Sequence, residues 1–119
     1  MKISRIHYIL FFGWITLVTI GSLLPATSFP PWADLGGNRD KVAHFAAYFV
    51  TSLLFYLAFH ARFKKSDIYA VIFSCGYGAI LEVAQILVPG RECSFNDLIA
   101  NFSGVLFFFI LHRILWGKM

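Results

Sequence analysis

Eight polar side chains that could bind a ligand or transfer a proton stand in an otherwise very apolar sequence. A histidine and a glutamate among them could act as general acid or base, and a lysine and an arginine could hold an anion. Ionisable side chains inside a membrane are costly, so where several face one another they usually mark a functional site. The predicted ligand-binding residues are Asp40, Lys41, His44, Glu82, Gln85, Arg91, Asp97 and Asn101, with His44 and Glu82 as the candidates for a catalytic role.

The composition indicates a small integral membrane protein. Of 119 residues 59% are hydrophobic and only 13% are charged, against about 25% charged in a soluble domain. Four apolar stretches, approximately 6–24, 42–61, 68–88 and 98–116, can each cross a hydrocarbon core of about 30 Å as a helix. The sequence therefore predicts an all-α, four-helix transmembrane bundle that forms a single domain over residues 1–119.

The distribution of basic residues predicts the orientation of this bundle. Seven of the ten Lys and Arg residues lie before the first stretch, in the 62–67 connection or at the C-terminus, where Arg113 and Lys118 stand. Because short cytoplasmic segments carry the excess of Lys and Arg, we expect both termini in the cytoplasm of a bacterium and a multi-pass protein of its inner membrane. The net charge of +4 is then explained by topology, and no nucleic-acid partner is expected.

The same topology places the polar residues near the extracytoplasmic ends of the last three helices. Helical spacing also gives each of these helices one polar or small stripe. A polar stripe facing lipid would be penalised, so the stripes should converge on a pocket that opens outward. The stripes consist of Lys41, His44, Tyr48 and Ser52, then Ser74, Gly78, Glu82 and Gln85, then Asp97, Asn101 and Gly104.

Structural interpretations compete with the functional one at several of these positions. Asp40 and Asp97 could be helix N-caps, and Ser94 with Asp97 resembles a capping box. Asn101 and Gln85 could provide interhelical hydrogen bonds.

The remaining positions have structural alternatives as well. Arg91 could contact lipid headgroups, and Gly78 and Gly104 suit close helix packing. A buried Glu82 should be protonated or paired, so Glu82 and His44 could form a purely structural ion pair.

Three blocks of the chain resemble the signature of the VanZ-like family. In order, they are Asp40-Lys41-x-x-His44-Phe45-x-x-Tyr48-Phe49, Glu82-x-x-Gln85-x-x-x-Pro89-Gly90-Arg91 and Asp97-x-x-x-Asn101-x-x-Gly104. The resemblance covers residues 40–104, and Glu92-Cys93 departs from it. The namesake of the family is associated with low-level resistance to the glycopeptide teicoplanin. The resemblance implies a site at the matching positions and no defined catalytic residue.

Three function classes follow from this site. The first is a protein that binds or modifies a cell-envelope component, such as a lipid-linked cell-wall precursor, or a lipophilic glycopeptide. The second is a membrane enzyme that acts on a lipid-linked or phosphorylated substrate, with His44 or Glu82 in acid–base roles. The third is a small proton-coupled exporter, which the uncharged inner halves of the helices disfavour.

No cofactor and no metal is expected, because no recognised metal-ligand spacing occurs in the sequence. Cys75 and Cys93 are expected to be unpaired because they lie too far apart for a disulfide. The partners expected are the lipid bilayer and, through Gly13 and Gly21 of the first helix, a second copy of the chain.

Overall fold

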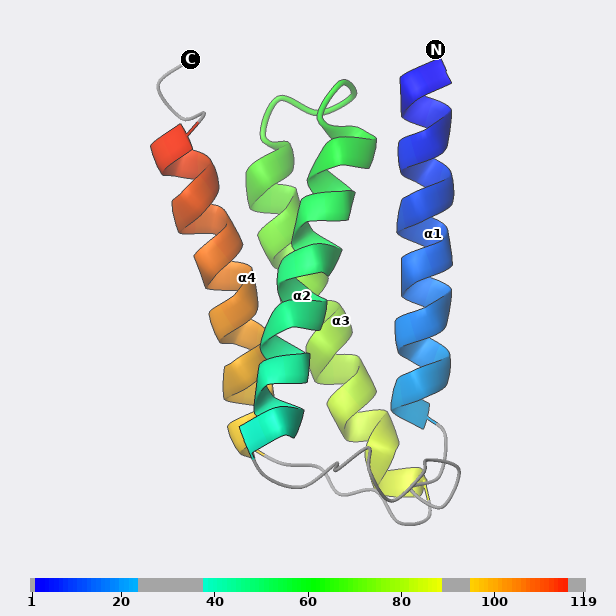
Figure 1. Cartoon of the computed structure of the whole chain (residues 1–119), viewed down its shortest axis with the longest axis vertical. Coiled ribbons are helices and arrows are strands. Elements are labelled where there is room, and N and C mark those ends of the chain that lie inside the picture. Colours follow the sequence, from blue (N-terminus) through cyan, green and yellow to red (C-terminus); the bar gives the residue numbers. More distant parts are fainter. Residues whose placement is uncertain (1, 24–37, 89–94, 116–119) are drawn as a thin grey trace.

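The fold is a bundle of four long helices. The computed structural model describes residues 2–23, 38–88 and 95–115, and the side chains of all of these except residues 2–4 and 38–40. The helices stand side by side along the long axis of the molecule (Figure 1). Each is long and apolar enough to cross a membrane, so the predicted all-α class is confirmed. They are α1 (Lys2–Leu23), α2 (Asn38–Phe59), α3 (Ser66–Ala84), which continues into the 3-10 turn η2 (Gln85–Leu87), and α4 (Phe95–Leu115).

Each helix begins two to four residues before the apolar stretch that predicts it. For example, α2 begins at Asn38 instead of near residue 42, and α4 begins at Phe95 instead of near residue 98. The polar residues of a first turn keep helical hydrogen bonding although they extend beyond the apolar part of the span, so hydropathy places the start too late. The α-helical part of α3 ends at Ala84 because η2 tightens its last turn.

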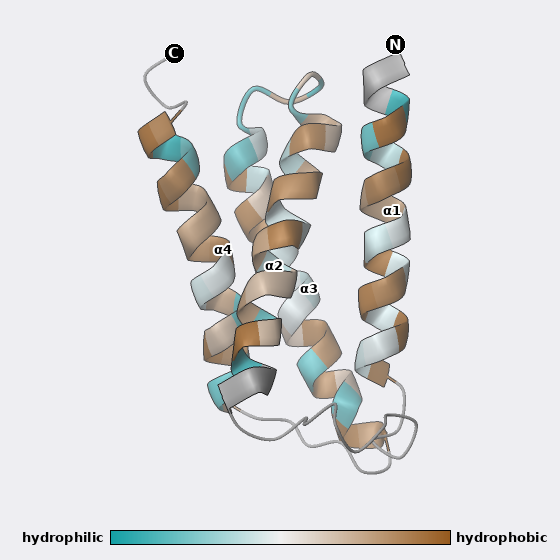
Figure 2. Ribbon diagram, viewed as in Figure 1, coloured by the Kyte–Doolittle hydropathy of each residue, from teal (hydrophilic) through white to brown (hydrophobic). Residues whose placement is uncertain are grey.

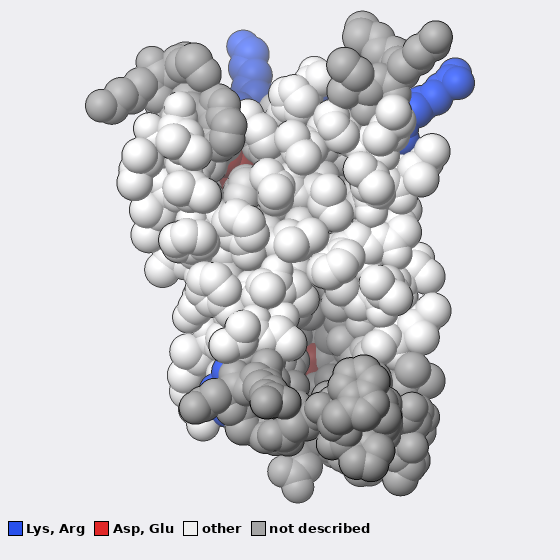
Figure 3. Space-filling model, in the orientation of Figure 1, with Lys and Arg blue, Asp and Glu red and all other residues white. Residues whose placement is uncertain are grey.

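The helix ends alternate between the two ends of the bundle. The first residue of α1, the last residue of α4 and the α2–α3 connection lie at the same end (Figure 1). Uncharged side chains cover the middle of the visible face, and Lys and Arg lie toward its ends (Figure 3). Hydrophilic residues likewise concentrate toward the helix ends (Figure 2). The bundle is 45 Å long, which matches a bilayer with its headgroups, about 40–45 Å.

Two glycines bring the three helices α2, α3 and α4 into close contact. A Cβ atom added to Gly104 of α4 would lie 2.2 Å from the backbone oxygen of Phe45 in α2. A Cβ atom added to Gly78 of α3 would lie 2.9 Å from the ring of Tyr48 in α2. Small residues of this kind let membrane helices approach closely. The packing role predicted for both glycines is therefore confirmed.

Small polar side chains occupy the middle of the same interface. The Ser52 hydroxyl donates to the Ser74 hydroxyl at 3.0 Å, and neither residue has any exposed surface. Trp14 of α1 donates from Nε1 to the hydroxyl of Thr51, also fully buried, at 2.9 Å. These contacts satisfy polar groups that would otherwise be costly inside a membrane protein.

Helix α1 packs on the outside of the other three. Among its described side chains only Phe11 is buried, and its ring contacts the rings of Phe55 and Phe59 of α2 and Phe73 of α3. The ring of Tyr8 also contacts Phe59 edge-on, and hydrogen bonds add further attachments. Besides Trp14, the Tyr77 hydroxyl donates to the Ile15 carbonyl at 3.0 Å and lies against the Thr19 hydroxyl, and Gln85 Nε2 donates to the Ser22 carbonyl at 3.0 Å.

We expect replacement of Gln85 with methionine to loosen α1 by a small amount. The change keeps the shape of the side chain and removes its hydrogen bond to Ser22. Because an interhelical hydrogen bond in a membrane contributes about 0.6 kcal/mol on average, the free energy of unfolding should fall by about that amount. Unfolding in mild detergent measures the effect, with Leu87→Met at an 87% exposed position as the control. If the two variants were equally stable, the hydrogen bond between Gln85 and Ser22 would not contribute to holding α1 against the bundle.

Candidate functional site

Four of the eight predicted residues meet at the end of the bundle opposite the α2–α3 connection. His44 comes from α2, Glu82 from α3, and Asp97 and Asn101 from α4. These four residues are called the His44 cluster below. Nδ1 of His44 lies 2.8 Å from Oδ1 of Asn101, and Nε2 lies 3.8 Å from Oδ2 of Asp97. One ligand atom each of His44, Glu82 and Asp97 lies within 4.8 Å of the other two.

The four residues of the His44 cluster differ in their exposure. Glu82 and Asn101 are 3% and 1% exposed, while the side chains of His44 and Asp97 are 15% and 13% exposed. His44 and Asn101 each lie six residues inside their helices, about 9 Å from the ends. His44 and Asp97 are therefore the more accessible members of the cluster.

The contact with Asn101 fixes the orientation and the tautomer of His44. A carboxamide oxygen can only accept a hydrogen bond, so Nδ1 of His44 carries the hydrogen and donates it to Asn101. Nε2 is then the ring nitrogen that faces Asp97. An imidazole held in this way can accept a proton at Nε2, donate one when doubly protonated, or bind a cation.

The structure modifies the cap interpretation of the two aspartates. Helix α4 begins at Phe95, so Asp97 is its third residue and lies inside the first turn, where a carboxylate still suits the positive end of the helix. Its side chain faces His44, in addition to any effect on the helix end. Asp40 is likewise the third residue of α2, and its side chain and Ser94 lie outside the described parts.

The other predicted residues have different positions. Gln85 is buried but bonds to α1, as the interhelical interpretation predicts. Lys41 is partly exposed in the first turn of α2, three residues before His44. Arg91 lies outside the described residues, as does Cys93, and the thiol of Cys75 is free.

A second charged cluster, which sequence reasoning missed, lies at the other end of the bundle. Oδ2 of Asp67, at the start of α3, lies 3.1 Å from Nε of Arg113 and 3.5 Å from Nδ1 of His112, both in the last turns of α4. Asp67 and His112 are each 8% exposed. The available signal was an acidic first turn in one helix and a basic last turn in its antiparallel neighbour, a pairing that also suits both helix dipoles.

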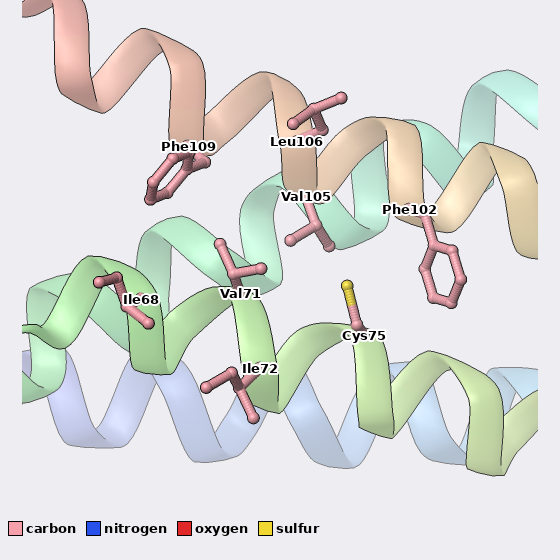
Figure 4. A pocket seen from close by; sticks show the side chains of 8 residues that line it. All are labelled: Ile68, Val71, Ile72, Cys75, Phe102, Val105, Leu106 and Phe109. Atoms are coloured by element: carbon pink, nitrogen blue, oxygen red, sulfur yellow. The ribbon is translucent and has the colours of Figure 1, made fainter.

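An apolar groove of about 480 Å³ runs between α3 and α4 (Figure 4). Its lining contains none of the predicted site residues. It is formed by Ile68, Val71, Ile72 and Cys75 of α3 and by Phe102, Val105, Leu106 and Phe109 of α4. Phe102 directly follows Asn101, so one end of the groove lies beside the His44 cluster along α4.

Comparison with known proteins identifies a family. A family model described as VanZ/LLP1 matches residues 3–116, which include almost all of the four helices. No curated protein and no solved structure matches the chain.

Proposed function

The chain belongs to the VanZ/LLP1 family, and from this premise we propose that it binds the polar headgroup of a cell-envelope lipid on the extracytoplasmic side of the membrane. The observation that carries the proposal is the His44 cluster. Ionisable side chains from three membrane-capable helices converge within 4.8 Å at one end of the bundle. Polar residues placed together inside a membrane protein generally serve a ligand, an ion or a proton. The distribution of Lys and Arg predicts that this end is extracytoplasmic.

The side chains of the site suit a headgroup that carries both hydroxyl or amino groups and phosphate. The carboxylates of Glu82 and Asp97 accept hydrogen bonds from hydroxyl and ammonium groups. Lys41, partly exposed one turn from His44, offers a cation for phosphate, and Arg91 is predicted to offer a second. Lipid-linked cell-wall precursors combine these groups.

The groove between α3 and α4 supports a lipid as the ligand. It is apolar along its length, and Phe102 at one end is adjacent in sequence to Asn101 of the His44 cluster. A headgroup bound at the cluster would therefore place its acyl or polyprenyl chain beside a surface that fits it (Figure 4). A lipophilic glycopeptide such as teicoplanin is the competing ligand, since it also joins a polar part to an acyl chain.

We expect the headgroup to bind with at least about 10-fold lower affinity when Glu82 is replaced with glutamine or His44 with alanine. Each change removes a charged or strongly hydrogen-bonding group, worth about 1.5–3 kcal/mol when such a bond is made to an ionised partner. Native mass spectrometry of the purified chain in mild detergent, titrated with a polyprenyl phosphate, with a polyprenyl-linked sugar phosphate and with teicoplanin, measures the affinities.

The matched control is His112→Ala, the same substitution in the cluster at the other end of the bundle. It should leave the affinities unchanged. Undiminished lipid binding by both Glu82→Gln and His44→Ala would remove the His44 cluster from the binding site. Selective binding of teicoplanin would replace the lipid with the glycopeptide as the ligand.

A second candidate function is catalysis on a lipid-linked or phosphorylated substrate. The observation that favours it is the His44 ring, which is anchored through Nδ1 at Asn101 and so leaves Nε2 as the nitrogen that can accept a proton, as a general base requires. Release of phosphate or headgroup from the same lipids by the purified chain tests it. An enzyme would lose turnover in His44→Ala by at least about 100-fold, and an absence of turnover in the parent chain would exclude this reaction.

A further inference from the structure

We propose that His44, Glu82 and Asp97 together bind one divalent transition-metal ion of the Zn²⁺ or Mn²⁺ class. Nε2 of His44 and Oδ2 of Asp97 are 3.8 Å apart, and the Glu82 carboxylate completes a set of ligand atoms within 4.8 Å of one another. Around an ion with bonds of about 2.0–2.2 Å, tetrahedral ligand atoms lie about 3.4 Å apart. Small rotations of the three side chains would bring their ligand atoms to that separation.

Asn101 prepares His44 for this role. Histidines that bind a metal usually donate their other ring N–H to a carbonyl or carboxylate, which fixes the ring and the tautomer. Nδ1 of His44 donates to the Asn101 oxygen at 2.8 Å, so the lone pair of Nε2 points to the side of the ring where Asp97 lies. Asn101 is itself 1% exposed, so this hydrogen bond is shielded from water.

The charges of the three side chains also favour a cation. The carboxylates of Glu82 and Asp97 and the Nε2 atom of His44 are all groups that bind divalent cations. Glu82 is 3% exposed, and buried charges in proteins are generally paired or bound to metals. One divalent ion would balance both carboxylates while His44 stays neutral.

The ligand types indicate the class of ion. Imidazole nitrogen suits Zn²⁺ and the other transition metals, whereas sites for Mg²⁺ and Ca²⁺ are built from oxygen. Three protein ligands leave at least one coordination position for another oxygen. The inference builds on the proposed function at this point, because a headgroup phosphate would take that position beside two carboxylates that would otherwise repel it.

The binding of Zn²⁺ and Mn²⁺ alone tests the proposal. The full chain, purified without a histidine tag and stripped with a chelator, is dialysed against each ion in mild detergent, and bound metal is measured by mass spectrometry. We expect saturation at one ion per chain, and at least about 10-fold weaker binding by Glu82→Gln, Asp97→Asn and His44→Ala. Asn101→Ala should weaken binding by about 10-fold as well.

The second His–carboxylate pair of the protein supplies matched controls. Asp67→Asn and His112→Ala change the same residue types at the other end of the bundle and should leave metal binding intact. Co²⁺ absorption bands of the parent chain give a second measurement that needs no variant to fold. Failure of the folded parent to bind Zn²⁺ or Mn²⁺ in a saturable manner would overturn the proposal, as would undiminished binding by Glu82→Gln and Asp97→Asn.

The two proposals for this site can fail separately. If the parent chain binds the lipid but no ion, the metal site is refuted and the proposed function stands. If the ion binds with the expected dependence on Glu82 and Asp97 but none of the lipids binds, the metal site is supported and the proposed function is refuted.

Discussion

Replacing Gly104 with alanine should lower the free energy of unfolding by about 1–3 kcal/mol, the cost of overpacking a well-packed interior. The new Cβ atom would lie 2.2 Å from the Phe45 oxygen and 3.1 Å from the Phe49 nitrogen. Both are backbone atoms of α2, so no side-chain rotation can relieve the contact. Helices α2 and α4 would have to separate, and leucine at the same position should have a larger effect.

Unfolding in mild detergent measures this loss, and Gly76→Ala is the control. Gly76 is also in the middle of a helix, but a Cβ atom there would meet nothing within 4 Å. Alanine at Gly76 should be neutral or stabilising, because glycine is the poorer helix former by about 0.8–1.0 kcal/mol. Equal effects of the two substitutions would show that close packing at Gly104 does not hold α2 against α4.

Replacing Asp67 with alanine should lower the free energy of unfolding by about 2 kcal/mol. Loss of one partner of a buried ion pair costs about 3–5 kcal/mol, and the cost is smaller here because the Arg113 side chain is 49% exposed. The change also leaves His112, 8% exposed, without its acidic neighbour and removes a hydrogen bond from the Ile68 backbone N–H.

A double-mutant cycle separates the ion pair from these other effects. Arg113→Gln alone should cost less than Asp67→Ala, and the double variant should be less destabilised than the sum of the two by about 0.5–1 kcal/mol. Thermal or denaturant unfolding in detergent provides the four values. Additive effects would show that Asp67 and Arg113 contribute independently, in spite of their 3.1 Å separation.

Much of the interior could be predicted from the sequence because a membrane imposes a simple rule. Polar and small residues that recur on one helix face must turn away from lipid. Ser74, Gly78, Glu82 and Gln85 follow that spacing, and all four are buried. The same rule places Asn101 inside, where it meets His44.

The contacts that could not be predicted depend on information that hydropathy does not contain. The partner of Gln85 is a backbone carbonyl, and every residue offers one, so nothing in the sequence marks Ser22. The pairing of Asp67 with His112 requires knowing that α3 and α4 are neighbours, which four similar apolar stretches do not reveal. Hydropathy also predicts the helix starts too late, because the polar residues of a first turn give no apolar signal.

The largely exposed surface of α1 determines where this protein can change during evolution. Phe11 is the one buried residue among the described side chains of α1, while Ile9 and Leu17 are 70% and 62% exposed on its surface. In a bilayer that surface meets acyl chains, which accept leucine, isoleucine, valine or phenylalanine alike. The exposed positions of α1 should therefore vary freely among apolar residues, while Phe11 and Trp14 of α1 and the buried glycines and polar groups of α2, α3 and α4 should vary little.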